Sequence, residues 1–381
     1  MAEYLTNTTD LTKVASAIRA KGGISAPLVY PDGFVTAIQA IQTGTELQII
    51  VTVKSGATVT ATKGSLSVSG TSVNGTCTLT VPEAGAWSVN ATLGGETSDT
   101  KSVTFTDRYA VTFSFVSAVL NNNDWATIKE VSDNGEGANY WSVGDRKAVT
   151  LNGTVGHLTL SNYKTYAFII GFNHNSSVEG KNRIHFQLAK TALSGGTDVC
   201  FHDNKYAPDF GWSQPGADYF VMNVTHTNAG GWKSSQMRTN ICGTSLSSYS
   251  GTIIAVIPEA LRSVLKSVTK YTDNTANEGG STASYVTATT DYFFLLSEFE
   301  VFGSIVYANS TESSKQAQYA YYSAGNSKIK YKHDGTSTAA AWWLRSPRAT
   351  MPNKFVNVYV DGTIDSSTAG YSLGFAPGFC V

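Results

Sequence analysis

Charged residues are scarce in this sequence. They make up 14% of its 381 residues, and the formal net charge is −1. A nearly neutral chain gives no electrostatic basis for binding nucleic acid or an anionic membrane surface. No stretch approaches the ~18 apolar residues that a membrane-spanning helix needs, so we expect no membrane insertion. We therefore look for a function outside the nucleic-acid-binding and membrane-embedded classes.

A signal peptide and short-range metal motifs are also missing. The start of the chain has no basic region followed by an apolar run, so we expect no cleaved leader, and release within a particle by lysis is a route out of the cell. None of the cysteines forms a CxxC or CxxH pair, which argues against a zinc ribbon and leaves disulfide pairing open. No GxSxG motif marks a serine nucleophile. The four cysteines are Cys77, Cys200, Cys242 and Cys380.

Three histidines, His174, His185 and His202, offer metal ligands, and Asp203 follows the last of them. Histidines scattered in this way are more often satisfied polar positions in a loop-rich core than metal ligands. We predict no metal and no cofactor.

Small polar residues and aromatics are abundant instead, with aromatics at 11%. This composition is typical of β-rich, loop-rich extracellular or virion proteins. The chain also exceeds the ~250–300 residues at which a single core stops growing, so we predict two or three domains.

Residues 1–44 predict two short helices that end at Gly22 and Gly44, the first capped by Thr9 or Asp10. Such short helices need a partner for their apolar stripes: each other, a neighbouring subunit or a larger assembly. The segment is either a cap packed on the next domain or an attachment segment. The stripes are Leu11, Val14, Ala15 and Ile18, then Phe34, Ile38 and Ile41.

Residues 45–116 alternate β-branched and small polar residues between turn clusters. About seven short strands fit this length, which favours an all-β immunoglobulin-like sandwich. The stretch "VPEAGAWSVNAT" predicts a turn followed by a strand that buries Trp87. We interpret this domain as a spacer.

Residues 117–381 predict an α+β domain rich in loops. One helix follows a cap at Asn123 or Asp124 and buries Trp125, and a second starts at Pro258. Strands are expected at "YAFIIGF", "RIHFQLA", "DYFFLLSEFEVFG" and "FVNVYV". Long loops on a compact core usually serve binding. The remaining stripe positions are Ile128 and Val131 in the first helix, and Leu261, Val264, Leu265 and Val268 in the second.

Several blocks in this region carry a family resemblance, among them "NDWATIKEVSDNG", "FIIGFNHNSSVEGKNRIHFQL", "GGWKSSQMRTNICG" and "WWLRSP…GYSLGFAPGFCV". From about residue 121 to the end, the chain resembles C-type-lectin-like proteins of the formylglycine-generating-enzyme subtype, found in gut Firmicutes and their prophages. The opening "LTNTTDLTKVASAIRAKGG" is similar to the N-terminal segment of phage tail and baseplate-associated proteins.

The resemblance implies a binding protein. Related proteins include the variable proteins of diversity-generating retroelements, in which template adenines are miscopied. A template of AAC and AAT codons yields most residue types between Arg348 and Leu373 but cannot yield Met351 or Lys354. The resemblance therefore implies that residues 341–381 form a variable ligand-binding region.

The resemblance does not imply an enzyme here. Oxidases of this fold hold copper with two nearby thiolates, whereas the cysteines of this region have no short-range partner. Calcium-dependent sugar binding uses carboxylate and amide pairs around a cis-proline, but Pro352 has only the amide of Asn353 beside it.

Two aromatic blocks, "AAAWWLRSP" and "GFAPGFCV", read as framework strands around a changeable surface. Trp342 and Leu344 are expected on one face of the first block, with Trp343 and Arg345 on the other, and Arg345 paired to a carboxylate or to carbonyls. The predicted framework residues are Trp342, Trp343, Arg345, Phe375 and Phe379.

Between the blocks, mixed polar and aromatic residues form a paratope-like surface, the alternative being an ordinary solvated loop. On "FVNVYV", we expect Asn357, Tyr359 and Asp361 on the exposed face, with Phe355 as an exception. The predicted ligand-binding residues are Arg348, Thr350, Met351, Asn353, Lys354, Asn357, Tyr359, Asp361, Thr363, Asp365, Ser367 and Tyr371.

The sequence thus predicts a phage or prophage tail adhesin that binds a protein or glycan on a bacterial surface and joins other tail proteins through residues 1–44. Such adhesins often form trimers, although no heptad fixes the number of subunits. The expected location is the virion tail. The alternatives are a secreted or cell-surface bacterial lectin and, less favoured, a metal-dependent enzyme on the same fold.

Overall fold

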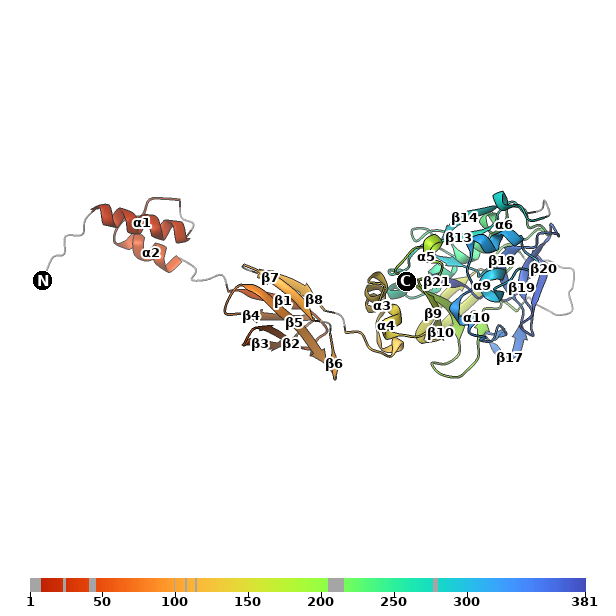
Figure 1. The fold of residues 1–381 in the computed structure, drawn as a ribbon, viewed down its shortest axis with the longest axis horizontal. Coiled ribbons are helices and arrows are strands. Elements are labelled where there is room, and N and C mark those ends of the chain that lie inside the picture. The colour runs from red at the N-terminus through yellow and green to blue at the C-terminus, as the bar shows by residue number, and fades with distance from the viewer. Residues whose placement is uncertain are drawn as a thin grey trace. The chain divides into compact units, whose positions relative to one another are not determined.

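The computed structural model describes residues 8–22, 25–40, 46–98, 100–106, 108–113, 115–204, 216–276 and 280–381 (Figure 1). The chain divides into two compact units, Met1–Phe115 and Val116–Val381. About 22% of it is helical and 36% is strand, the strands lying in several separate sheets. This composition agrees with the predicted multidomain, β-rich protein.

The first unit begins with two helices, α1 (Thr8–Gly22) and α2 (Asp32–Ala40). They pack on one another, but fewer apolar side chains are buried between them than predicted. Val14 and Ile38, both predicted to be buried, are 49% and 54% exposed. The helix already includes Thr9 and Asp10, so neither is its cap. Ile41 and Gly44 lie outside the described residues. The shared core consists of Ala15, Ile18, Phe34 and Ala37.

The rest of this unit is built from strands around a core of its own. One sheet has the order β4-β1-β8, and the other has the order β3-β2-β5-β6 with β7 also paired to β5. Trp87, on β5, is 1% exposed and donates its indole N–H to the Glu83 carbonyl at 3.1 Å, as its predicted burial requires. The strands are β1 (Gln48–Thr52), β2 (Thr58–Lys63), β3 (Leu66–Thr71), β4 (Thr76–Thr80), β5 (Gly85–Leu93), β6 (Glu96–Thr97), β7 (Lys101–Phe105) and β8 (Arg108–Thr112).

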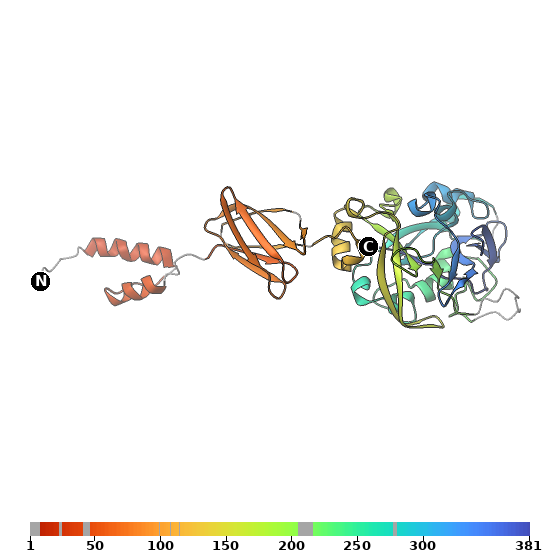
Figure 2. The same cartoon turned by 90° about the horizontal axis from the view of Figure 1, so that it is seen from below.

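The second unit is organised around a five-stranded sheet of order β15-β21-β11-β10-β9, in which the long β9–β10 hairpin is prominent (Figure 2). The last strand, β21, lies between the edge strand β15 and the central strand β11, so it is paired on both sides. Ser132 donates a hydrogen bond to the Val381 carbonyl, which ties α3 to the C-terminus. Helix α3 is capped by the side chain of Asp124, one of the two predicted caps.

Three smaller sheets complete this unit: β12-β16-β17, β13-β14 and β18-β19-β20. The strands are β9 (Arg146–Val155), β10 (Leu158–Phe172), β11 (Ile184–Lys190), β12 (Val199–Cys200), β13 (Val268–Asp273), β14 (Val286–Asp291), β15 (Phe293–Phe294), β16 (Lys330–Lys332), β17 (Gly335–Ala340), β18 (Trp342–Pro347), β19 (Lys354–Val358), β20 (Ile364–Thr368) and β21 (Gly378–Cys380). The α-helices are α3 (Trp125–Asp133), α4 (Gly137–Tyr140), α5 (Ser176–Glu179), α6 (Gly231–Ser234), α7 (Ile253–Val256), α8 (Glu259–Arg262), α9 (Glu298–Phe302) and α10 (Ala320–Ser323). Other helical turns, of 3₁₀ or π type, are η1 (Leu120–Asn122), η2 (Met237–Cys242), η3 (Ala283–Tyr285) and η4 (Ser310–Lys315).

Two predicted elements differ from the structure. The helix expected from Pro258 ends at Arg262, and β13 follows from Val268, because β-branched residues there alternate and pair with β14. The predicted strand at "DYFFLLSEFEVFG" is reduced to β15, because Ser297 and Glu300 form a capping box that starts α9.

Among the described residues, no helix is both long and apolar enough to cross a membrane.

Candidate functional site

The predicted framework strand β18 is buried along its whole length. It pairs with β19, and β19 pairs with β20, so that β19 is the central strand of an antiparallel sheet. All five predicted framework residues are fully buried, at 0% exposure. The loops that join these strands are therefore held on a closely packed base.

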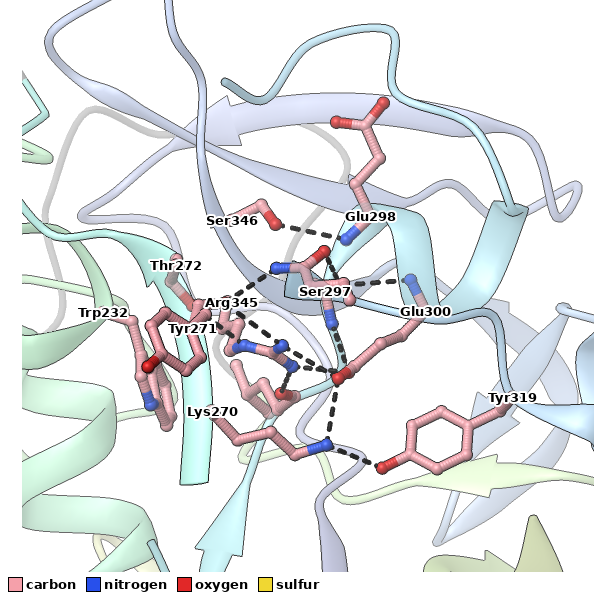
Figure 3. A network of polar contacts seen from close by, with 12 residues as sticks. Trp232, Lys270, Tyr271, Thr272, Ser297, Glu298, Glu300, Tyr319, Arg345 and Ser346 are labelled. Atoms are coloured by element: carbon pink, nitrogen blue, oxygen red, sulfur yellow. Dashed lines mark hydrogen bonds and ion pairs between the residues drawn. The ribbon is translucent and has the colours of Figure 1, made fainter. Parts of the chain in front are cut away.

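Arg345 extends from β18 into a dry polar network (Figure 3). Its guanidinium donates to both carboxylate oxygens of Glu300 and to the Leu295 carbonyl at 2.9 Å, and its Nε donates to Thr272 Oγ1 at 2.9 Å. An arginine and a carboxylate joined by two parallel N–H···O hydrogen bonds form a strong and directional ion pair. The sequence predicts that Arg345 pairs with a carboxylate or with carbonyls, and it has partners of both kinds.

Lys270 supplies a second buried cation to the same network. Its Nζ donates to Glu300 at 2.9 Å, to Glu179 at 2.8 Å and to the Tyr319 hydroxyl at 2.8 Å. Two cations thus face two carboxylates in a region closed to water. The four charges balance, which is the condition for keeping them in a low-dielectric core.

The two glutamates closest to Arg345 have opposite pKa shifts. Burial alone would raise the pKa of Glu300, but the charges of Arg345 and Lys270 hold it well below its ordinary value. Burial raises the pKa of Glu312 to about 7, although this carboxylate accepts hydrogen bonds from the Asp273 N–H at 2.9 Å and from Ser346 Oγ at 2.8 Å. Arg345 and Lys270 are already paired with Glu300 and Glu179, and Glu312 forms no ion pair with either cation.

Next to Lys270, the side chains of His174, Glu179 and His185 have ligand atoms within 4.8 Å of one another. His185 Nδ1 also lies 3.1 Å from the Tyr319 hydroxyl and 3.2 Å from Cys380 Sγ. His174 Nδ1 is 3.2 Å from Glu179 Oε1, though not in hydrogen-bonding geometry. These groups are of the types that bind zinc.

The charges around this cluster do not fit a divalent cation. The ammonium of Lys270 already forms an ion pair with the Glu179 carboxylate. A divalent metal ion bound to Glu179 would place two further positive charges beside that ammonium, in a core with a low dielectric constant. Burial also holds the pKa of His185 well below its ordinary value, so this ring is neutral. We interpret the cluster as part of the structural network. His202, the third histidine considered in the sequence, lies elsewhere: its backbone N–H donates to His333 Nδ1 at 3.1 Å, and its ring Nδ1 accepts the Asn204 N–H at 2.8 Å.

The four cysteines are all buried and free. Burial raises the pKa of Cys200 and of Cys380 to about 12, and it raises the pKa of Cys242 well above its ordinary value. A buried thiol that stays protonated is a poor nucleophile and a poor copper ligand.

The predicted ligand-binding residues fall into three groups. Five are exposed, among them Met351 at 39% and Tyr359 at 42%. Six more are half-buried, and Asn357 alone is fully buried. The exposed residues are Thr350, Met351, Tyr359, Asp361 and Thr363, and the half-buried ones are Arg348, Asn353, Lys354, Asp365, Ser367 and Tyr371.

The predicted exposure of the Asn357 side chain is wrong. It lies on the central strand β19, where neighbours cover both faces, and it is 0% exposed. Its amide donates to Ser367 Oγ at 2.6 Å, while Oδ1 has no hydrogen-bond partner among the residues that the structure describes. Strand alternation distinguishes two faces, but it does not show whether a second layer covers the outer one.

The β18–β19 loop, residues 348–354, is held in place by Asn228. The side-chain amide of Asn228 donates hydrogen bonds to three backbone carbonyls of this loop, those of Arg348 at 3.1 Å, Met351 at 2.9 Å and Lys354 at 3.0 Å. The Arg348 guanidinium also lies 4.5 Å from the centre of the Tyr307 ring. Sequence reasoning missed Asn228, because nothing local in "THTNAGG" points to a loop more than a hundred residues away.

The β19–β20 turn, residues 359–363, is held by its own side chains. The Asp361 carboxylate accepts the Thr363 N–H at 2.9 Å and the Thr363 hydroxyl at 2.6 Å, and these bonds lower the pKa of Asp361. The Tyr359 N–H donates to the Thr363 carbonyl at 2.8 Å. Both loops, which lie at opposite ends of β19, are thus pre-organised, and this limits the conformational entropy that binding to either would cost.

Residues 217–381 match a family described as a domain of unknown function, DUF6273. No curated protein and no solved structure matches the chain. The matched region covers β18, β19 and β20, both loops and most of the buried network, and it gives them no established role.

Proposed function

We propose that this protein is a receptor-binding adhesin of a phage or prophage tail. In this proposal the Val116–Val381 unit is a C-type-lectin-like domain, the β1–β8 region is an immunoglobulin-like spacer and the α1–α2 pair is an attachment segment. The observation that carries the proposal is the pair of ordered loops, 348–354 and 359–363, which lie at opposite ends of β19 and expose Met351 and Tyr359 beside the buried strand β18. Rigid aromatic and adaptable polar side chains on a firm scaffold are typical of binding surfaces.

The N-terminal helices support the attachment role. Among the described residues, four buried side chains form their shared core, and Val14, Val35 and Ile38 are about half exposed, at 49%, 51% and 54%. Apolar residues left uncovered on a marginal helix pair favour docking on another protein. Buried, protonated thiols and a charge-balanced core favour a binding role over catalysis.

Replacing Tyr359 and Asp361 together with alanine is expected to weaken binding to host cells by at least ~10-fold, because central aromatic and charged contacts dominate interface energies. Flow cytometry with the fluorescently labelled full chain on gut Firmicutes strains measures this. Tyr109→Ala is the control, since it truncates a 37% exposed tyrosine of the first unit. Unchanged binding by the double variant would contradict the assignment of this surface.

Diversification by a retroelement is the second part of the proposal. It predicts a downstream near-copy of the codons for residues 341–381 that differs only at adenines and is followed by a reverse transcriptase gene. We expect the differences to fall on exposed positions such as Thr350, Tyr359 and Thr363, and to spare the buried Phe355 and Val356. Sequencing the downstream DNA tests this prediction. The absence of such a copy would contradict diversification of residues 341–381.

A further inference from the structure

A polar pocket of about 540 Å³ opens on the β12–β16–β17 sheet. Hydroxyl groups dominate its lining, together with one carboxylate and one aromatic ring. A pocket of this size accommodates a small ligand. The polar side chains that line the pocket are those of Thr197, Asp198, Ser327, Tyr331, Thr336 and Ser337.

The carboxylate of the pocket is fixed from behind. Asp198 forms an ion pair with the buried Lys190, and it accepts the Tyr321 hydroxyl at 3.2 Å. Lys330, 1% exposed, also acts on Asp198 through its charge, and its Nζ has no hydrogen-bond partner among the described residues. A carboxylate oriented in this way presents its remaining lone pairs as a rigid acceptor.

The pocket adjoins the proposed binding surface. A Cβ atom on Gly362, in the β19–β20 turn, would lie 3.0 Å from the Cγ1 atom of Ile329, which also lines the pocket. The framework residue Trp342 donates its indole N–H to the Lys328 carbonyl at 2.9 Å, which fixes the same segment. A ligand seated in the pocket would therefore extend toward the turn that carries Tyr359 and Asp361.

We infer that this pocket binds a neutral pyranose of a bacterial surface glycan, with Asp198 accepting from sugar hydroxyls and Tyr331 facing the apolar side of the ring. The inference rests on the proposed function and narrows its ligand from a protein or glycan to a glycan. Sugar hydroxyls both donate and accept, as the Ser and Thr hydroxyls here do. Aromatic rings supply a flat apolar surface with one polar end.

Saturation-transfer NMR with the full chain tests the pocket directly. The probes are the methyl glycosides of glucose, galactose, mannose, N-acetylglucosamine, N-acetylgalactosamine and rhamnose, each at millimolar concentration. Ser337→Trp fills the pocket from an exposed position on β17, and Thr338→Trp, one residue further along the same strand and also exposed, is the matched control. We expect transfer to at least one sugar, reduced at least ~10-fold by Ser337→Trp and kept by Thr338→Trp. Transfer to none of them, or equal transfer in Ser337→Trp, overturns the inference.

Cell binding separates this inference from the proposed function. Host cells are treated with periodate, which cleaves vicinal diols of glycans, or with protease, before the labelled chain is added. Loss of binding after periodate alone supports the glycan. Binding that survives periodate and disappears after protease keeps the adhesin role and overturns the pyranose pocket. Sugar binding in NMR without binding to any tested cell would instead support the pocket and contradict the adhesin role.

Discussion

Arg345→Met is expected to lower the free energy of unfolding of the Val116–Val381 unit by about 3–5 kcal/mol. Methionine keeps most of the apolar stem but removes the guanidinium. Glu300 then remains buried at 0% exposure with Lys270 as its only cation, and the Leu295 carbonyl and Thr272 hydroxyl lose a donor. The large cost comes from leaving one partner of a buried ion pair uncompensated, since the intact pair itself adds little net stability.

Denaturant unfolding of the full chain followed by tryptophan fluorescence measures this loss. The Met1–Phe115 unit has its own core around Trp87, so its transition serves as an internal control and should not move. Lys129→Ala removes one side of a salt bridge whose side chains are 40% and 42% exposed, and it should cost below about 1 kcal/mol. A loss for Arg345→Met no larger than that for Lys129→Ala would show that the network does not hold this unit together.

Local patterns predict the elements that local chemistry determines. The cap at Asp124, the burial of Trp125 and the burial of Trp87 follow from residues within a few positions of one another. The four apolar positions after Pro258 are buried as predicted, at 0–8% exposure, although most of them belong to a turn and a strand and not to a helix. Burial was predictable there because apolar residues need cover in either conformation, whereas the period over so short a run was ambiguous.

The polar core shows where sequence reasoning stops. The sequence predicts that Arg345 meets a carboxylate, but it does not identify Glu300 as that residue or add Lys270 and Glu179 to it. These side chains come from β18, α9, β13 and α5, and only the tertiary fold brings them together. The capping-box residues Ser297 and Glu300 could have predicted the start of α9 from the sequence. The apolar run before them instead predicts a strand that continues through α9.

The candidate site divides in the same way. Exposure of Tyr359 and Asp361 follows from a turn between two strands, and the burial of Asn357 depends on what covers β19. The pocket beside Asp198 combines segments around residues 197, 327 and 336, which no single motif connects. Surface loops are visible in a sequence, while a concave site made by several of them is a property of the fold.

Glu312 makes the stability of this unit depend on pH in a direction opposite to that of Glu300. Burial raises the pKa of Glu312 from its ordinary value of 4.5 to about 7, so the folded state holds the proton more tightly than the unfolded chain does. Its contribution to stability is therefore fully present below about pH 4.5 and is lost as the pH rises through about 7. At 1.36 kcal/mol for each pKa unit, the loss amounts to about 3 kcal/mol. Glu300, whose pKa is held low by Arg345 and Lys270, instead stabilises the fold above about pH 4.5 and loses that contribution in acid.

Glu312→Gln removes this titration, because glutamine is neutral at every pH and keeps an oxygen to accept the Asp273 N–H, while its NH2 group replaces the oxygen that accepts from Ser346 Oγ and Gln316 Nε2. That replacement costs the variant stability at every pH, so the change with pH is what counts. The free energy of unfolding of the variant relative to the wild type should rise by about 3 kcal/mol from pH 4.5 to pH 8, measured on the same transition as for Arg345→Met. Comparing the two proteins at each pH cancels the titration of the buried histidines, which both share. Glu259→Gln, at a side chain 76% exposed, should show no such trend. A difference between Glu312→Gln and wild type that stayed constant from pH 4.5 to 8 would mean that Glu312 titrates normally, and that the core accepts a third carboxylate charge without cost.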